Sequence, residues 1–252
     1  SPGTTSIIVP IDTIETELLL ADLESAEKRL DSLKKKAKFD KELQKAQPVL
    51  EALVAHLGEG KPASAFEVPE LNEPFHQVWR ELSLLTAKKF IYCANVDEDG
   101  ITEDNDHVKA LRNLAASRGC EMVKICARLE EELQGLSDAE QAEMLESYGI
   151  TESGLENIIR TGYHTLGLAS FLTAGPKEVR AWTFRQGWKA PQTAGVIHTD
   201  FEKGFIRAEV ISYEDYMKYK SEAACRAAGV LRVEGKDYVV RDGDMMNFLF
   251  NV

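Results

Sequence analysis

Two stretches near the amino end carry apolar residues at alternating spacings of three and four positions. The first runs from Leu23 to Ala37 and the second from Leu43 to Leu57. This spacing places the apolar side chains on one face of a helix. The short break at Phe39 and Asp40 therefore predicts an antiparallel helical hairpin whose two apolar faces bury each other. Pro48 lies inside the second stretch, so that helix is expected to kink or to begin there.

A different pattern begins after Pro74. Residues 75–85 are expected to be helical, and two continuous apolar runs follow at 89–95 and 122–127. Each run is followed by a loop and a helical segment, which is the pattern of a parallel sheet covered by helices. Two strands alone do not make such a sheet stable, so we expect the rest of the sheet to be supplied elsewhere.

The pattern changes again in the last third of the chain, where short strands predominate. Strands are expected at 178–184, 205–211, 238–240 and 246–250. Asp242-Gly243 separates the last two and predicts a hairpin turn. One helix is expected from Tyr213 to Ala228, ending at Gly229 as a C-cap. Strands around one helix are typical of a compact α+β module.

Composition limits the class of protein. The chain has 252 residues, of which 44% are hydrophobic and 29% charged, as in soluble globular proteins. No apolar run approaches the roughly 20 residues of a membrane span. Ser1–Pro10 lacks the features of a secretory signal. We therefore expect a cytoplasmic protein that does not insert into membranes.

Charge is distributed unevenly along the chain. The net charge is −12, yet Leu166–Val252 holds 12 basic and 11 acidic residues. The overall field does not attract nucleic acid, but a nearly neutral C-terminal third is free to bind RNA locally. The change in charge also predicts a domain boundary near residue 165.

Lysines gather at the tip of the predicted hairpin. They are Lys34, Lys35, Lys36, Lys38, Lys41 and Lys45. Such a cluster can contact phosphate backbones. The alternative is a solvated helix end, where lysines interact favourably with the helix dipole.

The four cysteines do not form a metal or disulfide pattern. Cys93, Cys120, Cys126 and Cys225 are irregularly spaced, and no CxxC motif occurs. Cys93 and Cys126 lie in apolar, strand-like runs. We expect them to be reduced, buried core residues.

No phosphate-binding loop of the form G-x-x-x-x-G-K-[ST] is present. The two Gly-Lys pairs, Gly60-Lys61 and Gly235-Lys236, are followed by neither Ser nor Thr. The loop Asn95-Val96-Asp97-Glu98 is more informative, because ligands of α/β sheets bind beyond the carboxyl ends of strands. A guanine-reading loop uses an Asp to accept hydrogen bonds from the base. Glu98 occupies that place, so guanine selection is expected to be weak; the alternative is an ordinary turn.

Two further groups have alternative interpretations. His198 and Asp200 are candidates for acid–base chemistry or for a structural hydrogen bond, and we favour the latter. Trp182, Phe184 and Trp188 alternate with basic residues, so they are candidates for base stacking or for core packing.

Several long stretches resemble the YchF/Obg-like ATPase family, in its bacterial form, from about Ile11 to Val252. They are Phe171–Thr183, Ala190–Glu209, Glu234–Asp244, the Phe-Asn-Val end, and Ile11–Leu18 together with Ala21–Ser25. The resemblance implies an α/β plus α+β fold. Its parts are a partial P-loop NTPase domain of Rossmann-like type, an inserted antiparallel coiled-coil hairpin, and a β-grasp TGS domain.

The resemblance also implies boundaries, activity and partners. Residues 1–74 correspond to the hairpin, 75–165 to the C-terminal part of the nucleotide-binding domain, and 166–252 to the TGS domain. Family members bind and hydrolyse ATP in preference to GTP, with Mg²⁺. They associate with ribosomes, so the large ribosomal subunit or RNA becomes the expected partner of the TGS domain and the Lys34–Lys45 tip.

Individual site residues follow from the same resemblance. Asn95 is expected to order the specificity loop, Val96 to contact adenine through its backbone, and Glu98 to replace the guanine-reading Asp. Cys126 and Ala127 match the last nucleotide loop, whose backbone amides border the base. No catalytic residue and no metal ligand is expected in this chain.

The 252 residues depart from the family in one respect. The family's phosphate loop, switch segments and magnesium-binding Ser/Thr lie upstream of the part that matches. We therefore expect this chain to keep base recognition and to lack ATP hydrolysis by itself. The competing hypothesis is a non-enzymatic module that binds RNA, the ribosome or a protein.

Overall fold

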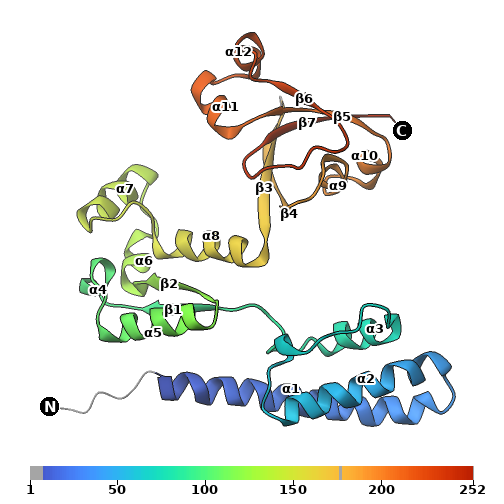
Figure 1. Cartoon of the computed structure of the whole chain (residues 1–252). Helices are drawn as coiled ribbons and strands as arrows, with labels where there is room; N and C mark the ends of the chain where they lie inside the picture. Colours follow the sequence, from blue (N-terminus) through green and yellow to red (C-terminus); the bar gives the residue numbers. More distant parts are fainter. Residues whose placement is uncertain (1–7, 176–177, 252) are drawn as a thin grey trace. The chain divides into compact units, whose positions relative to one another are not determined.

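A computed structural model describes residues 8–175 and 178–251. The chain forms two compact units, Ser1–Leu155 and Glu156–Val252. Both are seen in Figure 1. The first unit holds a long helical hairpin and a small parallel sheet, and the second is built around a mixed sheet.

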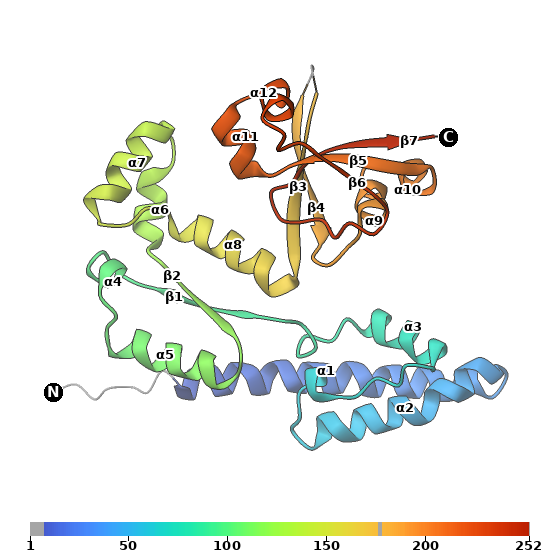
Figure 2. The same cartoon turned by 45° about the horizontal axis from the view of Figure 1, so that its top comes forward.

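The hairpin consists of α1 (Ile8–Ala37) and α2 (Lys41–Gly58), which lie side by side in Figures 1 and 2. The predicted apolar stripes meet at their interface. Those fully or nearly fully buried are Ala26, Leu30, Leu33, Ala37, Ala46, Leu50, Leu53 and Leu57. The hairpin prediction is thus confirmed for the described helices. The stripe does not extend to the start of α1, where Ile14 and Leu18 are exposed.

The turn of the hairpin shows where the second helix begins. Asp40 is the N-cap of α2, and its side chain accepts from the amides of Glu42 and Leu43. Pro48 lies within the helix, so the expectation that the helix begins there is wrong. The side-chain cap at Asp40 starts the helix before the proline is reached.

The segment after the hairpin folds back onto it. A short 3₁₀ turn, η1 (Ala63–Ala65), leads to α3 (Glu73–Leu82). Phe75 and Val78 of α3 are buried in the same core as the hairpin stripes. The hairpin and α3 therefore share one hydrophobic core.

The parallel sheet of the first unit has two strands among the described residues, β1 (Ile91–Asn95) and β2 (Glu121–Ile125). They pair in register from Ile91↔Glu121 to Asn95↔Ile125. The predicted parallel pairing is confirmed. The first unit also contains the helices α4 (Asp99–Thr102), α5 (Asp106–Ser117), α6 (Ala127–Leu133) and α7 (Asp138–Ser147). The next helix, α8 (Gly154–Leu166), begins at the end of the first unit and lies mostly in the second.

The expected burial of β1 is wrong. None of its five residues is buried, and Cys93 is exposed, whereas Cys126 is buried as expected. The physical reason is the small size of the sheet. With two described strands and α5 packed against them, the sheet faces are only partly covered.

The second unit is built on a five-stranded mixed sheet in the order β4-β3-β7-β5-β6. Its strands are β3 (Leu168–Ala174), β4 (Val179–Arg185), β5 (Phe205–Ile211), β6 (Arg232–Glu234) and β7 (Met245–Phe250). The first and last strands, β3 and β7, are parallel neighbours, and the other pairs are antiparallel.

Side chains alternate between two cores on the two faces of this sheet. Phe171, Val210 and Phe248 belong to one core, with α9 (Ala190–Gly195) and α10 (Thr199–Lys203) beside it. The other core contains Ile211 and Cys225. It lies under α11 (Tyr213–Tyr219) and α12 (Glu222–Ala227).

Three sequence expectations in this unit are wrong. The strand expected at 238–240 is reduced to an isolated bridge between Val239 and Lys189. The single helix 213–228 is broken, because Lys220 takes a left-handed conformation (φ 63°) and Ser221 caps a new helix. Its predicted end at Gly229 holds, with φ 72°. The turn at Asp242-Gly243 does not make a hairpin. It bonds to β3 instead, where Ser170 donates to Asp242 and accepts from Gly243.

Candidate base-recognition site

The five predicted base-site residues lie at the carboxyl ends of β1 and β2. Asn95 is the last residue of β1, and Val96 and Glu98 follow it. Cys126 follows β2 as the N-cap of α6, and Ala127 is the first residue of that helix. Because parallel strands end at the same edge of a sheet, the two loops are neighbours.

Hydrogen bonds tie the two loops together. The Ala127 amide donates to Asn95 Oδ1 at 3.2 Å, and the Val96 amide donates to the Ile125 carbonyl at 2.8 Å. Asn95 therefore joins the loop after β1 to the start of α6. Both amide groups are used inside the protein. What remains for a ligand is the Asn95 side-chain NH₂, a double donor, and the carbonyl of Val96.

The loop after Val96 turns tightly at a glycine. The Gly100 amide donates to Asp97 Oδ1 at 2.9 Å, and a Cβ added at Gly100 would lie 2.7 Å from the Val96 Cβ. Because real Cβ atoms do not approach so closely, any side chain at this position would push Val96 away. Gly100 is thus needed for the loop to pass over Val96.

Lys124 of β2 fastens the far part of the same loop. Its Nζ donates to the carbonyls of Gly100 and Ile101 and to Asp104 Oδ1, at distances between 2.9 and 3.0 Å. Arg112 also donates to Asp104. The hydrogen bond from Lys124, followed by that from Arg112, lowers the pKa of Asp104 below its usual 3.8.

The carboxylate of Glu98 is engaged by a residue that the sequence analysis did not find. Arg128 lies 3.1 Å from Glu98 Oε1 and also contacts Glu132 at 3.3 Å. Tyr148 lies in the same neighbourhood, since burial, followed by the negative charges of Glu98 and Glu132, raises its pKa. Arg128 lies three residues after the end of β2. This closeness to a strand end is the one feature of the sequence that pointed to Arg128 as a residue of the site.

A small hydrophobic cluster supports the site from below. Cys126, Leu129, Leu133 and Leu145 are buried together, and Val96 and Tyr148 pack against them. The side chain of Val96 is thereby held in the protein. Val96 as a whole is partly exposed, and its neighbours in the site, Asn95 and Ala127, are exposed.

The other sequence candidates have structural partners. His198 Nδ1 accepts from the Asp200 amide at 3.2 Å as the N-cap of α10, which confirms the structural hydrogen bond. Phe184 is buried and Trp182 is partly buried in the core of the second unit. The Arg180 guanidinium lies 4.0 Å from the Trp182 ring centre. Core packing therefore accounts for these rings.

The lysines of the hairpin tip fall into two groups. Lys34 pairs with Glu51 at 3.2 Å, and Lys45 pairs with Glu42 at 2.8 Å. The other four make no ion pair with any described residue and are exposed; they are Lys35, Lys36, Lys38 and Lys41. Lys35 and Lys36 lie in the last turn of α1, where the helix dipole favours a cation, whereas Lys41 is the first residue of α2.

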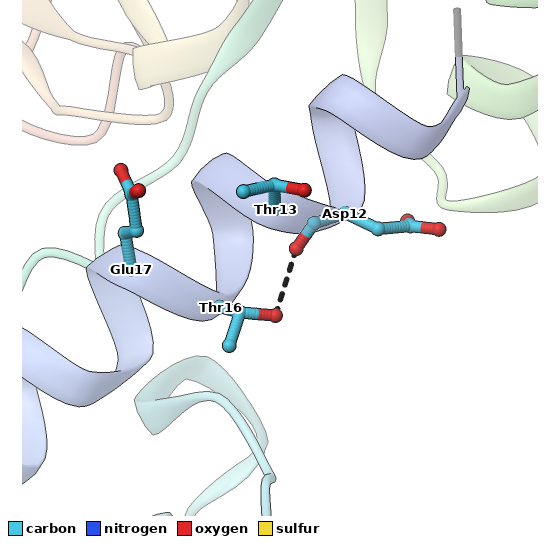
Figure 3. A pocket seen from close by; sticks show the side chains of 4 residues that line it. All are labelled: Asp12, Thr13, Thr16 and Glu17. Atoms are coloured by element: carbon cyan, nitrogen blue, oxygen red, sulfur yellow. Dashed lines mark hydrogen bonds between the residues drawn. The ribbon is translucent and has the colours of Figure 1, made fainter. Parts of the chain in front are cut away.

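A shallow depression lies elsewhere, on the outer surface of α1. Figure 3 shows its lining of Asp12, Thr13, Thr16 and Glu17, where the Thr16 hydroxyl donates to the Asp12 carbonyl at 2.8 Å. Its volume is about 360 Å³. None of the five base-site residues lines it, and it exposes acidic groups. We therefore do not assign nucleotide recognition to it.

Two searches of the described residues found nothing further. No group of three or more His, Cys, Asp or Glu is placed there to hold a metal ion. Within 8–175 and 178–251, no helix combines the length and apolar character needed to cross a bilayer.

Known proteins match this chain along most of its length. A family model described as YchF-GTPase_C, protein of unknown function (DUF933), matches residues 168–251. The chain is 46% identical over 243 residues to the ribosome-binding ATPase YchF of Escherichia coli O157:H7. It is 45% identical over 249 residues to the protein of that name from Bacillus subtilis (strain 168), covering 96% of this chain and 67% of the relative. The chain belongs to the YchF family.

A solved structure of the YchF family agrees with this assignment. The YchF GTPase of Schizosaccharomyces pombe is 34% identical and matches with a TM-score of 0.76, over 98% of this chain and 67% of that one. The mixed α/β fold is therefore shared with a YchF structure. The chain spans about two thirds of the length of the YchF relatives that it matches, for example 66% of the Escherichia coli protein.

Proposed function

We propose that this chain carries the base-recognition loops of a ribosome-associated, ATP-preferring P-loop NTPase of the YchF type. The observation that carries the proposal is the hydrogen bond from the Ala127 amide to Asn95, which joins the two loops beyond β1 and β2. The names of the relatives, ribosome-binding ATPase, support both the activity and the partner.

In this proposal, adenine is read by the atoms that the fold leaves available. The Val96 carbonyl accepts from the exocyclic amine of adenine, and the Asn95 side-chain NH₂ donates to N7 of the ring. Guanine carries an oxygen acceptor where adenine carries the amine. A carbonyl facing that oxygen repels it, so the same backbone atom favours adenine over guanine.

Glu98 adds to this preference. A carboxylate that selects guanine must accept two hydrogen bonds from the base, yet Glu98 is paired with Arg128 at 3.1 Å. Reading guanine would require breaking that pair. The pair is largely solvent-exposed, so its own contribution to stability is small. Its effect on selectivity comes from the direction in which it holds the carboxylate.

Phosphate chemistry is not assigned to these residues. The 252 residues contain no G-x-x-x-x-G-K-[ST] loop, and the described part holds no acidic or histidine cluster suited to Mg²⁺. We propose that the 252-residue chain binds ATP through its base without hydrolysing it, and that hydrolysis belongs to the whole YchF-type protein.

We further propose three functional parts. Residues 1–74 form the hairpin insertion, residues 75–165 belong to the nucleotide-binding domain, and residues 166–252 form a β-grasp TGS domain. The order β4-β3-β7-β5-β6, with the first and last strands parallel at the centre, supports the β-grasp assignment. A ribosome partner would place the protein in the cytoplasm.

Nucleotide selectivity tests the base-recognition proposal. We expect the 252-residue chain to bind fluorescent N-methylanthraniloyl ATP at least about tenfold more tightly than the GTP analogue, which is about 1.4 kcal/mol. Glu98→Asp shortens the side chain and withdraws it from Arg128. In this variant the ratio of the affinities for the ATP and GTP analogues should therefore be smaller. Glu132→Asp is the matched control, because Glu132 contacts the same Arg128. Equal affinity of the unaltered chain for both analogues would contradict the specificity-loop proposal.

Ribosome pelleting tests the proposed partner. Changing Lys35, Lys36, Lys38 and Lys41 to Glu should remove most of the chain from the ribosome pellet, because these lysines lack an ion pair among the described residues. The control changes four other exposed lysines of the first unit, Lys28, Lys61, Lys88 and Lys109, to Glu. Two outcomes would contradict a ribosome contact at the hairpin tip. One is an unchanged pellet fraction for the tip variant, and the other is an equal loss for the control variant. Binding to ribosomes without either nucleotide would favour the non-enzymatic module.

A further inference from the structure

The apex of the hairpin exposes an aromatic side chain. Phe39 is 93% exposed, while the apolar stripes of α1 and α2 behind it are buried. Among the described phenylalanines, Phe90 at 48% exposure comes next. A phenyl ring left in water forgoes the free energy that its burial would contribute. A solvated helix end accounts for exposed lysines but gives no reason for this ring.

The turn that carries Phe39 is closed by hydrogen bonds. The Phe39 amide donates to the Lys36 carbonyl at 3.0 Å, and Asp40 caps α2 by accepting from the Glu42 amide at 2.9 Å. Gln44 Nε2 donates across the turn to the Ala37 carbonyl at 2.7 Å. The backbone of the apex is therefore ordered, and the ring is presented from a fixed position. Preorganisation of this kind lowers the entropic cost of binding.

The charges around Phe39 are mainly positive. Asp40 is occupied in capping and Glu42 in pairing with Lys45. Four lysines remain without an ion pair among the described residues. One of them, Lys41, is the first residue of α2, where the helix dipole disfavours a cation. Helix stability therefore does not account for a lysine at that position.

An exposed ring among unpaired lysines fits single-stranded nucleic acid. Such sites combine cations that track the phosphates with an aromatic ring on which a base stacks. Protein interfaces differ, because lysine is depleted in them and a stable one buries about 800 Å² on each partner. One phenyl ring at a narrow apex offers far less apolar area. The chemistry of the apex therefore favours RNA over a protein surface.

We infer that Phe39 stacks on an unpaired base of RNA while Lys35, Lys36, Lys38 and Lys41 contact the phosphates on either side of it. This inference rests on the proposed ribosome association and names the part of the partner that the tip recognises. It distinguishes unpaired from paired RNA, because bases in a duplex are already stacked on each other. The net charge of −12 means that the field of the whole chain does not attract RNA, so the attraction at the apex has to come from these lysines.

The test is fluorescence anisotropy with a labelled RNA of ten nucleotides that has no secondary structure, and with its blunt duplex. The 252-residue chain should bind the single strand more tightly than the duplex. Phe39→Ala should weaken single-strand binding about tenfold and leave its salt dependence unchanged. Phe39→Trp should restore the affinity. Phe90→Ala is the matched aromatic control and should bind as the unaltered chain does.

Lysine changes should act differently. Lys38→Gln combined with Lys41→Gln should weaken binding and lower the slope of log K against log salt by about 0.7 for each lysine. Lys109→Gln, an exposed lysine of α5, is the control for lost charge and should leave the slope unchanged. Tight duplex binding, or no effect of Phe39→Ala, would overturn the inference.

Ribosome pelleting separates this inference from the proposed function. Loss of pelleting in the lysine variant but not in Phe39→Ala would overturn stacking and leave ribosome association standing. Pelleting that depends on Phe39 without any binding to naked RNA would overturn the RNA assignment in favour of a ribosomal protein. Binding of the single strand through Phe39 without pelleting would support the inference and contradict the ribosome proposal.

Discussion

Gly204 occupies a position where the backbone of another strand leaves no room for a side chain. It follows α10, and a Cβ placed on it would lie 2.0 Å from the Asn251 carbonyl oxygen. The Asn251 amide in turn donates to the Gly204 carbonyl at 2.9 Å. The end of β7 is thus held against the start of β5 by two backbones in direct contact. The backbone dihedral of Gly204 is ordinary, so the requirement for glycine is one of space.

We expect Gly204→Ala to destabilise the second unit by about 2 kcal/mol, as overpacking against rigid backbone does. The measurement is urea unfolding followed by the fluorescence of Trp182 and Trp188, in a Trp79→Phe background. Gly235→Ala is the control, since nothing lies within 4 Å of an added Cβ there. If the two variants have the same free energy of unfolding, the backbone at Asn251 can move away from the added methyl group without loss of stability, and the prediction is wrong.

The base-site residues illustrate what sequence reasoning reaches at this scale. The position of Asn95 and Glu98 at the carboxyl end of β1 was predictable from the apolar run before them, while their role in base recognition stays a prediction. Arg128 was not, because its role depends on the distance to Glu98 across two loops. The exposure of Cys93 was missed for a related reason. An apolar run indicates a strand, but burial depends on what packs against it.

Among the elements, α1 is fixed to the rest of the first unit through a buried carboxylate. Asp22 is 2% exposed and accepts hydrogen bonds from the amides of Leu85 and Thr86 and from the Thr86 hydroxyl, each at 2.7 Å. Thr86 also fixes the start of η1, because its hydroxyl oxygen accepts a hydrogen bond from the Ala63 amide at 2.8 Å. One carboxylate therefore holds three segments together.

Replacing Asp22 by Ala should destabilise the first unit by about 3 kcal/mol, because two amides and a hydroxyl lose their acceptor. Urea unfolding followed by helical circular dichroism measures this change. Asp22→Asn, which keeps one acceptor oxygen, should lose less. Asp31→Ala on the exposed side of α1 is the control and should fall within about 0.5 kcal/mol of the unaltered chain. If Asp22→Ala matches that control, the anchor has no energetic role.

Elements with strong local periodicity were predicted well, and those set by distant contacts were not. The hairpin helices follow from apolar spacing and from a cap at Asp40. Asp22 has no such signal, since its partners lie 63 and 64 residues away. The break at Lys220 was missed because the apolar pattern continues through it. The turn at Asp242-Gly243 bonds to Ser170 of β3 and does not close a hairpin. Its partner is determined by the neighbouring strand β3, which the turn residues themselves do not reveal.

At the scale of the whole molecule, the chain divides into two units of different construction. The first relies on a helical hairpin and a small sheet, whereas the second has a five-stranded sheet with a core on each face. The sequence predicts both kinds of pattern, because period and composition change along the chain. The order of the strands in the sheet could not be predicted from the sequence, because pairs such as β3 with β7 join residues that are far apart in the chain.

The anchoring of α1 has a mechanical consequence. Tyr92 of β1 donates to Glu15 at 2.9 Å, and Arg118 contacts Glu15, Asp12 and the Tyr92 hydroxyl. The strand that presents Asn95 is therefore joined to the base of α1, while Phe39 stands at its free end. Fifteen residues separate Asp22 from Ala37, a length of about 22 Å at 1.5 Å per residue. The contacts at Asp22 and at the base of α1 therefore lie about four helical turns or more from the apex. The span between them is braced by α3, through the shared core and through the hydrogen bond from the Asn72 side chain to the Lys45 carbonyl.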